Sequence, residues 1–292
     1  SAALKALDTS RSDNVIAFIE KYCFVPEGAK VGKPLVLEDF QKEFIRDIFD
    51  NPHGTRRAYL SLARKNGKTA LIAALILCYL AGPEARQNSQ IISGAMSREQ
   101  AALVFHLAEK MIYLNPKLEP HFKVIPSSKR IHGLVMNTEY KATSADASTA
   151  MGMSPVLAIL DEVGQIRGPN SDYVDSVETS QGAHSTPMLM AISTQAPSDV
   201  DLFSVWLDDA ERSGDPTIVS HVYTADEDCD LMDESQWKKS NPALGTFRNY
   251  EDLKNQMTQA KRIPSKESSA RNLLLNQRIS MDQIAFPPSV WK

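Results

Sequence analysis

The chain has few of the residues that build metal sites and disulfide frameworks. Its 292 residues include three cysteines, Cys23, Cys78 and Cys229, which lie far apart and without C-x-x-C spacing. The six histidines are scattered, and none accompanies a cysteine pair. This spacing argues against a structural zinc site and against a disulfide framework, so we expect reduced thiols.

Long hydrophobic runs and excess positive charge are also missing. The strongest apolar run, residues 70–81, is too short to span a bilayer, and no signal-peptide pattern precedes it. We therefore expect a cytosolic protein without membrane contact. The formal net charge is −4, so any contact with nucleic acid has to come from a local patch or from several subunits together.

What is present is the composition of a globular α/β protein. Hydrophobic residues make up 42% and charged residues 23% of the chain, which supports a sizeable core. Strand patterns alternate with helix patterns, and this predicts a mainly parallel sheet flanked by helices. The expected strands cover residues 57–62, 90–94, 156–160, 187–194 and 217–223, with an exposed or edge strand at 133–142.

The texture of the sequence changes near residue 236. Residues 1–235 are expected to form the α/β core with an N-terminal helical segment. Residues 236–280 contain polar helix patterns broken by prolines, which predicts a small helical lid or linker subdomain. Residues 281–292 have the composition of an interdomain linker that is cut short.

A Gly-Lys-Thr turn lies between the first expected strand and an apolar helix. Such a turn points backbone N–H groups at phosphates, Lys68 can reach the β- and γ-phosphate oxygens, and the Thr69 hydroxyl can bind magnesium. The usual first glycine of the motif is replaced by Leu62, and taken alone the tripeptide is equally compatible with an ordinary exposed turn. The loop residues expected to bind nucleotide are Ala63, Arg64, Lys65, Asn66, Gly67, Lys68 and Thr69.

Two carboxylates follow the apolar strand at residues 156–160. Ligand sites of open α/β sheets lie at the carboxyl ends of strands, so Asp161 is placed to hold a hydrated magnesium ion and Glu162 to polarise the attacking water. The alternative is an Asp-Glu pair that only caps the next turn. Thr194 and Gln195 end the next buried strand, where they can contact the water or the γ-phosphate, or else only satisfy local backbone groups.

Together these segments form a pattern that resembles the ATPase part of the large terminase subunit, the DNA-packaging motor of tailed bacteriophages. The resemblance covers nearly the whole chain. The segments that carry it are Asp39-Phe40-Gln41, the Arg64–Thr69 loop, Leu160–Gly164, Ile192–Gln195, Asn241–Gly245 and Asn272–Asn276.

The resemblance implies ATP and Mg²⁺ as ligands and assigns roles to single residues. It implies the P-loop NTPase fold of the type with an additional catalytic glutamate. It also implies that Gln41 contacts adenine, and that Arg64 beside the phosphates acts in catalysis together with Lys68 and Glu162. The family also carries a C-terminal nuclease domain with acidic residues, and the chain ends before such a cluster, so we do not expect it to cut DNA. The implied coupling motif, which senses the nucleotide state, consists of Ser193, Thr194 and Gln195.

The partners follow from the resemblance as well. It implies double-stranded DNA, a portal protein and a small terminase subunit as partners, in the cytoplasm of the infected bacterial host. It also implies that the working motor is a homo-oligomeric ring, and the isolated chain can still be a monomer.

Related motors often place an arginine and a glycine ahead of the acidic strand, where this chain has Met151-Gly152. The arginine finger is thus unassigned, and by chemistry alone the candidates are Arg98, Arg130, Arg167 and Arg212. For each of them a solvated surface arginine is the favoured alternative.

Three other functions share parts of the pattern. A nucleic-acid helicase of the related class would have the same loop and acidic strand, but it needs a second RecA-like domain. A small-molecule phosphotransferase would use lid arginines in place of Glu162. A nonenzymatic nucleotide clamp would bind ATP without turnover.

Overall fold

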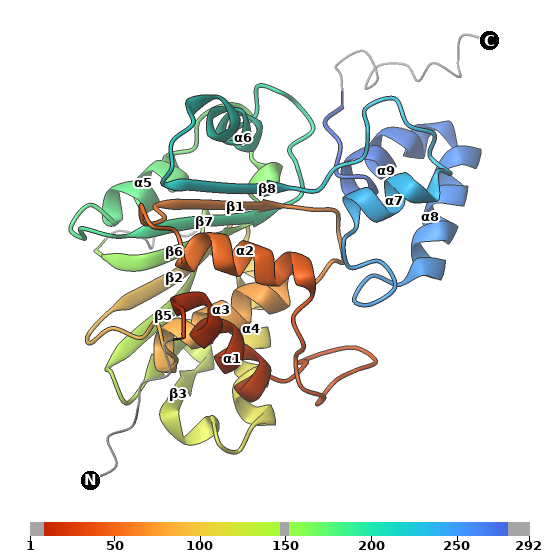
Figure 1. Ribbon diagram of the computed structural model, residues 1–292. Helices are drawn as coiled ribbons and strands as arrows, with labels where there is room; N and C mark the ends of the chain where they lie inside the picture. The colour runs from red at the N-terminus through yellow and green to blue at the C-terminus, as the bar shows by residue number, and fades with distance from the viewer. Residues whose placement is uncertain (1–8, 147–151, 280–292) are drawn as a thin grey trace.

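A single sheet of eight strands organises the computed structural model, which describes residues 9–146 and 152–279 (Figure 1). The strands are β1 (Arg57–Ser61), β2 (Gln90–Ala95), β3 (Phe122–Ile125), β4 (Arg130–Gly133), β5 (Thr138–Ser144), β6 (Pro155–Asp161), β7 (Met188–Ser193) and β8 (Ile218–Val222). Their order across the sheet is β3-β4-β5-β2-β6-β7-β1-β8.

The six strands from β5 to β8 in this order are parallel, which confirms the predicted fold class. Asp161 at the end of β6 pairs with Ile192 of β7, and Ser193 pairs with Ser61 at the end of β1. Because the strands are parallel and in this register, their carboxyl ends lie along one edge of the sheet. The phosphate loop, the two acids and the expected coupling residues all follow these ends.

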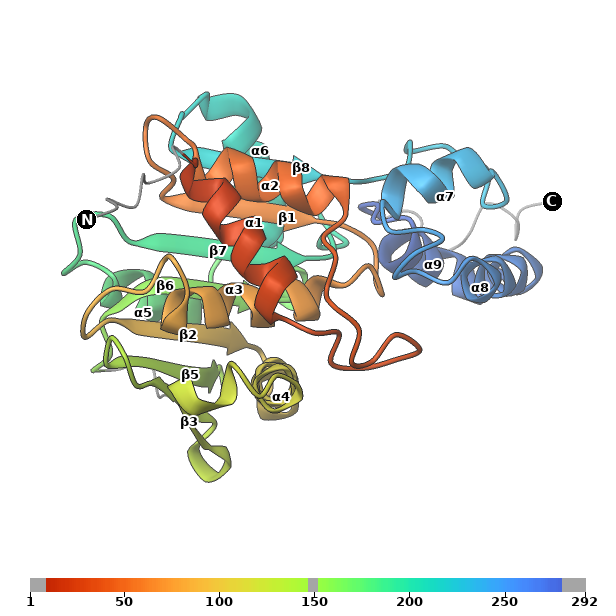
Figure 2. The ribbon, with the colours of Figure 1, turned by 60° about the horizontal axis from the view of Figure 1, so that its bottom comes forward.

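Both faces of the central strands are buried. Successive residues of β6 point to opposite faces, so that Leu157 and Ile159 join one apolar cluster while Ala158 and Leu160 join another. The first cluster is covered by helices α1 (Arg11–Tyr22), α2 (Asp39–Phe49), α3 (Lys68–Ala81) and α4 (Arg98–Leu114), and the second by α5 (Asp172–Ser180) and α6 (Leu202–Ser213). Figure 2 shows α1, α2 and α3 lying over β1, β2 and β7.

Local signals explain where several of these helices begin. Ser97 caps α4, because its hydroxyl accepts a hydrogen bond from the Gln100 N–H. At α2, the side chain of Gln41 accepts a hydrogen bond of 2.9 Å from the Glu38 N–H. Among the described helices, none has both the length and the apolar composition needed to cross a bilayer.

The prediction of one edge strand over residues 133–142 was wrong. The structure divides this segment between β4 and β5, which pair antiparallel around a turn at residues 134–137. Asn137 has a φ of 50°, a left-handed conformation that asparagine tolerates in tight turns. The edge strand on this side of the sheet is β3, and β5 lies inside the sheet between β4 and β2.

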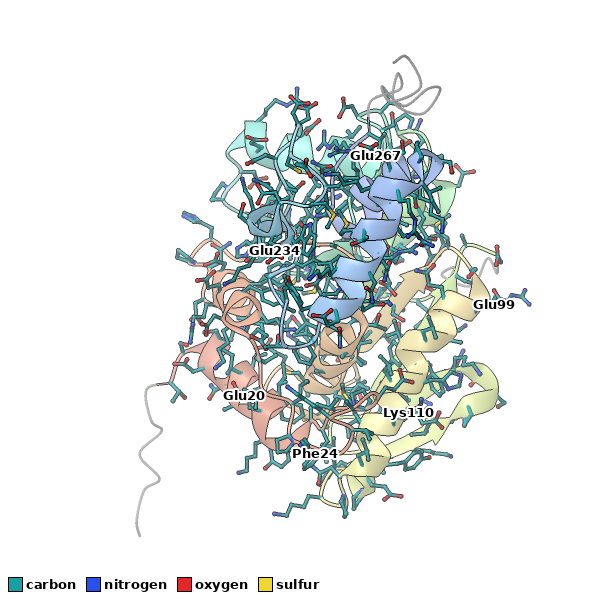
Figure 3. The ribbon with its side chains drawn as sticks, turned by 90° about the vertical axis from the view of Figure 1, so that its right-hand side faces the viewer. Glu20, Phe24, Glu99, Lys110, Glu234 and Glu267 are labelled. Carbon is teal, nitrogen blue, oxygen red and sulfur yellow. The ribbon has the colours of Figure 1, made fainter. Side chains whose placement is uncertain are left out.

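Three more helices lie beside the sheet rather than over it: α7 (Glu234–Ser240), α8 (Tyr250–Arg262) and α9 (Glu267–Leu274). They enclose an apolar cluster of their own around Trp237, Leu253 and Met257. Figure 3 views this side, with Glu234 of α7 and Glu267 of α9 labelled. The domain boundary at residue 236 stays a prediction, and the expected linker at 281–292 lies outside the described residues.

Candidate nucleotide and catalytic site

The phosphate loop joins β1 to α3 and leaves several backbone donors free. Gly67 is the N-cap of α3 with a φ of 80°, and Lys65 is also left-handed with a φ of 64°. In the described part of the chain, the N–H groups of residues 65–68 donate to no backbone carbonyl. Free N–H groups at a helix N-terminus form a site for an anion such as a phosphate group.

Two loop residues expected to bind nucleotide have backbone N–H groups that are already hydrogen-bonded. The Ala63 N–H donates to Ser240 O at 3.3 Å, and the Arg64 N–H donates to Leu273 O at 2.9 Å. Both amides are therefore bonded to the helical subdomain, and only the exposed side chain of Arg64 lines the cavity described below. Lys65 also lines the cavity, and its Nζ lies 3.2 Å from an Asp252 carboxylate oxygen on α8.

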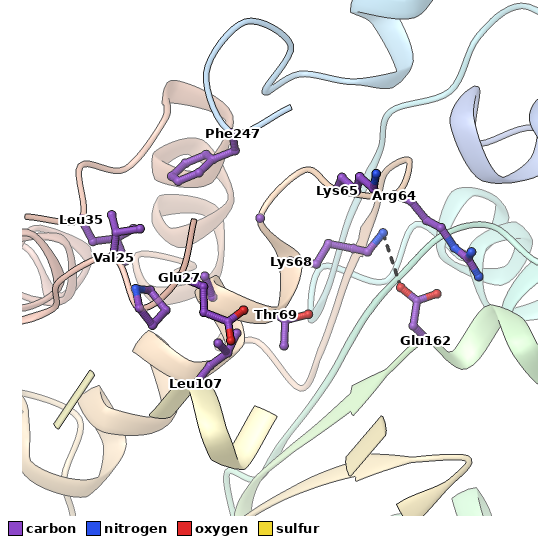
Figure 4. A pocket seen from close by; sticks show the side chains of 13 residues that line it. Val25, Glu27, Leu35, Arg64, Lys65, Lys68, Thr69, Leu107, Glu162 and Phe247 are labelled. Atoms are coloured by element: carbon purple, nitrogen blue, oxygen red, sulfur yellow. Dashed lines mark ion pairs between the residues drawn. The ribbon is translucent and has the colours of Figure 1, made fainter. Parts of the chain in front are cut away.

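Lys68 is buried at the base of the loop. Its Nζ donates to the carbonyls of Leu62 and Ala63, at 3.1 and 3.2 Å, and lies 3.4 Å from Oε1 of Glu162. Figure 4 shows the two side chains facing each other across the cavity. The amine is thus fixed by groups that an incoming phosphate can replace.

The acidic pair has two different environments. Asp161 ends β6 with 5% of its surface exposed, and burial together with the charge of Glu162 raises its pKa to about 7, against the opposing effect of Lys68. Glu162 is left-handed with a φ of 54°, which turns its side chain out of the strand and towards Lys68. The two carboxylates therefore differ both in burial and in the direction in which they point.

The three expected coupling residues have three kinds of contact. Thr194 donates from Oγ1 to Oε2 of Glu162 at 3.1 Å. The Ser193 hydroxyl accepts from the Gly164 N–H at 2.9 Å and donates to Thr194 O at 2.6 Å, so it satisfies local backbone. Gln195 turns away from the cavity to residues that follow α9.

A cavity of about 340 Å³ lies over the loop (Figure 4). Lys68, Thr69 and Glu162 lie at its polar end, and Phe247 and Val25 lie at the other end. A triphosphate with an attached planar base has this same division into a charged and an apolar part. Other apolar residues that line the cavity are Pro26, Leu35, Ala70 and Leu107.

Gln41 lies beside this cavity without lining it. Only 3% of its surface is exposed, and its Nε2 lies 3.9 Å from the place that a Cβ on Gly67 would occupy. Its Oε1 is already engaged by the Glu38 N–H, so its amide nitrogen is the group left for a ligand.

The donor set fits a magnesium ion held together with phosphates. Thr69 offers a hydroxyl and Asp161 a carboxylate, and oxygen ligands of this kind suit Mg²⁺. The described residues contain no group of three or more His, Cys, Asp or Glu side chains that could hold a metal alone. Magnesium commonly binds through one or two carboxylates plus substrate phosphates, which agrees with this arrangement.

Comparison with known proteins gives the family. The family model for the ATPase domain of the terminase large subunit matches residues 39–207, more than half of the chain. The chain belongs to this terminase family. It is 55% identical over 283 residues to the large terminase subunit of Enterobacteria phage HK97, covering 97% of this chain but only 56% of the relative.

Solved structures agree with this membership. The crystal structure of the HK97 large terminase matches with a TM-score of 0.89 at 55% identity, over 92% of this chain and 56% of that one. The ATPase domain of the Thermus phage P74-26 large terminase matches with a TM-score of 0.58 at 19% identity, over 81% and 92% of the two chains. At that identity the second match shows only the fold. This terminase chain spans about half the length of its HK97 relative.

The four candidate finger arginines of this terminase ATPase lie in different places. Arg167 donates to Gly164 O at 2.9 Å and lies 3.7 Å from Asp201, close to the acidic pair. Arg98 is the first residue of α4, which follows the carboxyl end of β2. Arg130 on β4 forms an ion pair with Glu139. Arg212 lies in the last turn of α6, which leads to the start of β8 at the other end of the strands. Met151 lies outside the described residues.

Sequence reasoning missed the residues that approach from other segments. Phe247 comes from the loop between α7 and α8, and its ring packs 3.5 Å from the Cβ position of Gly67. Val25 and Pro26 come from the loop after α1. No motif marks them, because their only shared property is apolar character at a place that the fold decides. The Asn241–Gly245 segment carries part of the family resemblance, but the sequence does not predict that Asn66 Nδ2 donates to Asn241 Oδ1 at 2.9 Å.

Proposed function

We propose that the chain is the ATP-hydrolysing motor domain of a viral terminase large subunit, which couples hydrolysis to translocation of double-stranded DNA into a procapsid. One observation carries the hydrolytic part of the proposal: Glu162 is held between Lys68, at 3.4 Å, and Thr194, at 3.1 Å, at the polar end of the cavity. A phosphate-binding lysine next to an oriented carboxylate is the arrangement needed to activate water at a γ-phosphate.

Each residue has a proposed role in this chemistry. Lys68 leaves the Leu62 and Ala63 carbonyls to bind the β- and γ-phosphates, and Glu162, released from Lys68, polarises the attacking water. Thr69 and Asp161 hold magnesium, which when bound neutralises charge on the phosphates.

The rest of the loop binds and orients the nucleotide. The backbone N–H groups from Lys65 to Lys68 cradle the phosphates, and the Arg64 side chain lies beside them. The amide nitrogen of Gln41 is the group proposed to contact adenine.

The wider assembly is proposed from family membership. DNA, a portal protein and a small terminase subunit are the proposed partners, and a homo-oligomeric ring in the cytoplasm of the infected host is the proposed working form. We also propose that residues 1–235 act as the ATPase core and residues 236–280 as a lid, which is supported by the separate apolar cluster around Trp237. Family membership favours this function over the helicase and phosphotransferase alternatives.

The test is release of phosphate by the purified chain with Mg²⁺ and ATP, over a range of chain concentrations and with or without duplex DNA. Loss of a general base lowers turnover by about 100-fold or more, so Glu162→Gln is expected to abolish release while ATP still binds. Glu99→Gln, which changes an exposed glutamate at the same sheet edge, is the matched control and should keep wild-type turnover.

The result also separates the motor from a clamp. Turnover that rises per chain with concentration supports a site completed by neighbouring subunits. Tight ATP binding without turnover under all conditions, equal in wild type and Glu162→Gln, would mean that the chain is a nucleotide clamp.

A further inference from the structure

The end of the cavity away from Lys68 decides which base a bound nucleotide can carry. The labelled side chains that line this end are all apolar: Val25, Leu35 and Phe247. The backbone of Val25 is engaged as well, because its N–H donates to Lys33 O at 2.8 Å and its carbonyl accepts from the Gly32 N–H at 2.9 Å. Apolar and aromatic side chains pack against the face of any base and do not distinguish one base from another.

Gln41 is the polar side chain that lies beside this end of the cavity. Its Nε2 lies 3.9 Å from the place that a Cβ on Gly67 would occupy, and the ring of Phe247 lies 3.5 Å from the same place. In the described part of the chain, Nε2 has no hydrogen-bond partner, whereas Oε1 of the same amide accepts from the Glu38 N–H at 2.9 Å. The two ends of the amide therefore differ in what they can offer to a ligand.

The contact with Glu38 fixes which end of the amide faces a nucleotide. The Glu38 N–H lies at the start of α2, and an N–H donates only to an acceptor. Turning the amide over would place its NH₂ group against this N–H and leave the N–H unpaired, which is unfavourable for a buried group. Gln41 thus presents its N–H groups to a base, while its oxygen stays with the helix.

Adenine and guanine differ at the position that a two-sided amide contact recognises. Adenine carries the N6 amino donor beside the N7 acceptor, and guanine carries the O6 acceptor beside the same N7. An amide that used both its oxygen and its nitrogen would pair with N6 and N7 of adenine and would reject guanine. An amide that presents only N–H groups finds an acceptor at N7 of either purine. Pyrimidines have no N7.

Glu27 is the other polar side chain of the cavity outside the phosphate loop and Glu162. Its Oε1 accepts from Lys110 Nζ at 2.5 Å, and Figure 4 shows its carboxylate on the side of Thr69 and Leu107 rather than beside Phe247. A carboxylate accepts hydrogen bonds from the amino group of either purine. Glu27 therefore does not supply a preference for adenine.

We propose that the base subsite recognises purines as a class, through a hydrogen bond from Gln41 Nε2 to N7, so that the chain binds and hydrolyses GTP as well as ATP. The inference rests on the proposed ATPase function, because it concerns the same cavity and names the substrate class. Hydrolysis itself is the same for both nucleotides, since Lys68, Thr69 and Glu162 lie at the end of the cavity that holds the phosphates.

The test is equilibrium binding of diphosphates to the 292-residue chain with Mg²⁺, since diphosphates are not turned over, together with phosphate release from ATP and GTP. ADP and GDP should bind within about fivefold of each other, and both triphosphates should be hydrolysed. A hydrogen bond between neutral groups corresponds to about fivefold in affinity, so 7-deaza-ADP, which has carbon in place of N7, should bind about fivefold more weakly than ADP. CDP lacks N7 and has a smaller ring, and it should bind at least about tenfold more weakly.

The variant Gln41→Glu separates recognition of N7 from a structural effect. It keeps an oxygen for the Glu38 N–H and replaces Nε2 by a second oxygen. The added negative charge should weaken binding of all four diphosphates, but ADP and 7-deaza-ADP should then bind equally, because no donor for N7 remains. Gln100→Glu is the matched control, since it adds the same charge in the first turn of α4 and does not line the cavity. It should keep the fivefold difference.

Two results would overturn the purine inference alone: a chain that hydrolyses ATP but prefers either purine diphosphate by more than about fivefold, or one that binds ADP and 7-deaza-ADP equally. Both are measured on the wild type, so a Gln41→Glu chain that fails to fold leaves the question decidable. A chain that binds no nucleotide would overturn the proposed function and this inference with it. A chain that binds purine diphosphates alike but releases no phosphate would overturn hydrolysis and support the base subsite.

Discussion

Glu162 adopts a backbone conformation that few residues other than glycine adopt. Its φ of 54° is left-handed, which costs on the order of 1–2 kcal/mol for a residue with a Cβ. A backbone bond from its N–H to Ile192 O and the side-chain contacts with Lys68 and Thr194 hold it there. The strain directs the carboxylate into the cavity while Asp161 stays within the strand end.

The neighbouring Asp161 gives a prediction about pH. Its pKa is raised from 3.8 to about 7, so the folded chain binds this proton more tightly than the unfolded chain. The free energy of unfolding should therefore fall as pH rises from about 4 to about 7 and then level off. Asp161→Asn removes this loss, so in chelator-treated buffer its gain over wild type in urea unfolding should be on the order of 2–3 kcal/mol larger at pH 8 than at pH 5.

The exposed Asp209→Asn change is the control, and it should alter the free energy of unfolding by no more than about 0.5 kcal/mol at either pH. An equal gain for Asp161→Asn at both pH values would contradict the prediction.

At the scale of elements, the short helix η3 (Val163–Gln165) packs against the end of β7 through a glycine. A Cβ on Gly164 would lie 2.3 Å from Thr194 O and 3.0 Å from Ser193 Oγ. This approach allows the Gly164 N–H to reach Ser193, and it keeps Thr194 within reach of Glu162. The distance between these two elements thus sets the geometry of the proposed base.

Gly164→Ala is expected to push the two elements apart. Overpacking of this kind costs about 1–3 kcal/mol in the free energy of unfolding, and the loss of the Thr194 contact should lower ATP turnover more than ATP affinity. Urea unfolding and phosphate release measure the two effects. Gly182→Ala, where the nearest atom to a Cβ is Thr179 O at 3.3 Å, is the control. Equal turnover in the two variants would show that the close approach is not needed.

The elements also show how far the sequence predicts the structure. The phosphate loop is predicted from its Gly-Lys-Thr turn and the two acids from the apolar strand before them, and both signals are local. The alternation of apolar and polar residues continues across the turn at residues 134–137, so this pattern predicts one unbroken strand. Asn137 at the end of the turn is the only local signal against that prediction. Phe247 was missed because its contact with Gly67 joins residues 180 positions apart. Such contacts are decided by packing, which local patterns do not contain.

At the scale of the whole molecule, the described residues form three apolar clusters, two on the faces of the sheet and one within α7–α9. The helical part is joined to the sheet by hydrogen bonds, for example those of Asn66 with Asn241 and of Gln195 with Asn276, and by the packing of Ala243 and Phe247 on the first cluster. Regions with separate cores open separately, so the helical part is able to move while the sheet stays folded.

Trp237→Phe tests this separation. The change removes the indole N–H that donates to Leu231 O at 2.7 Å and leaves that buried carbonyl unpaired, at a cost of about 1–3 kcal/mol. We expect faster hydrogen exchange in residues 234–274 and unchanged exchange in β6 and β7. Phe203→Leu, in the cluster on the α6 face, is the control and should affect the sheet instead. Equal acceleration in both regions after Trp237→Phe would show one cooperative unit.

The bonds from Gln195 to residues 272–278 also fix when the site can be completed during synthesis. The end of β7 with Gln195 emerges from the ribosome about 80 residues before the segment that binds Gln195, as the sequence separations of 77 to 83 show, and the loop and the acids emerge earlier still. Until residue 278 has emerged, all four polar groups of Gln195 lack their partners. A nascent chain therefore carries the whole phosphate loop well before Thr194 is held in place, and the proposed hydrolysis has to wait for α9 and the residues that follow it.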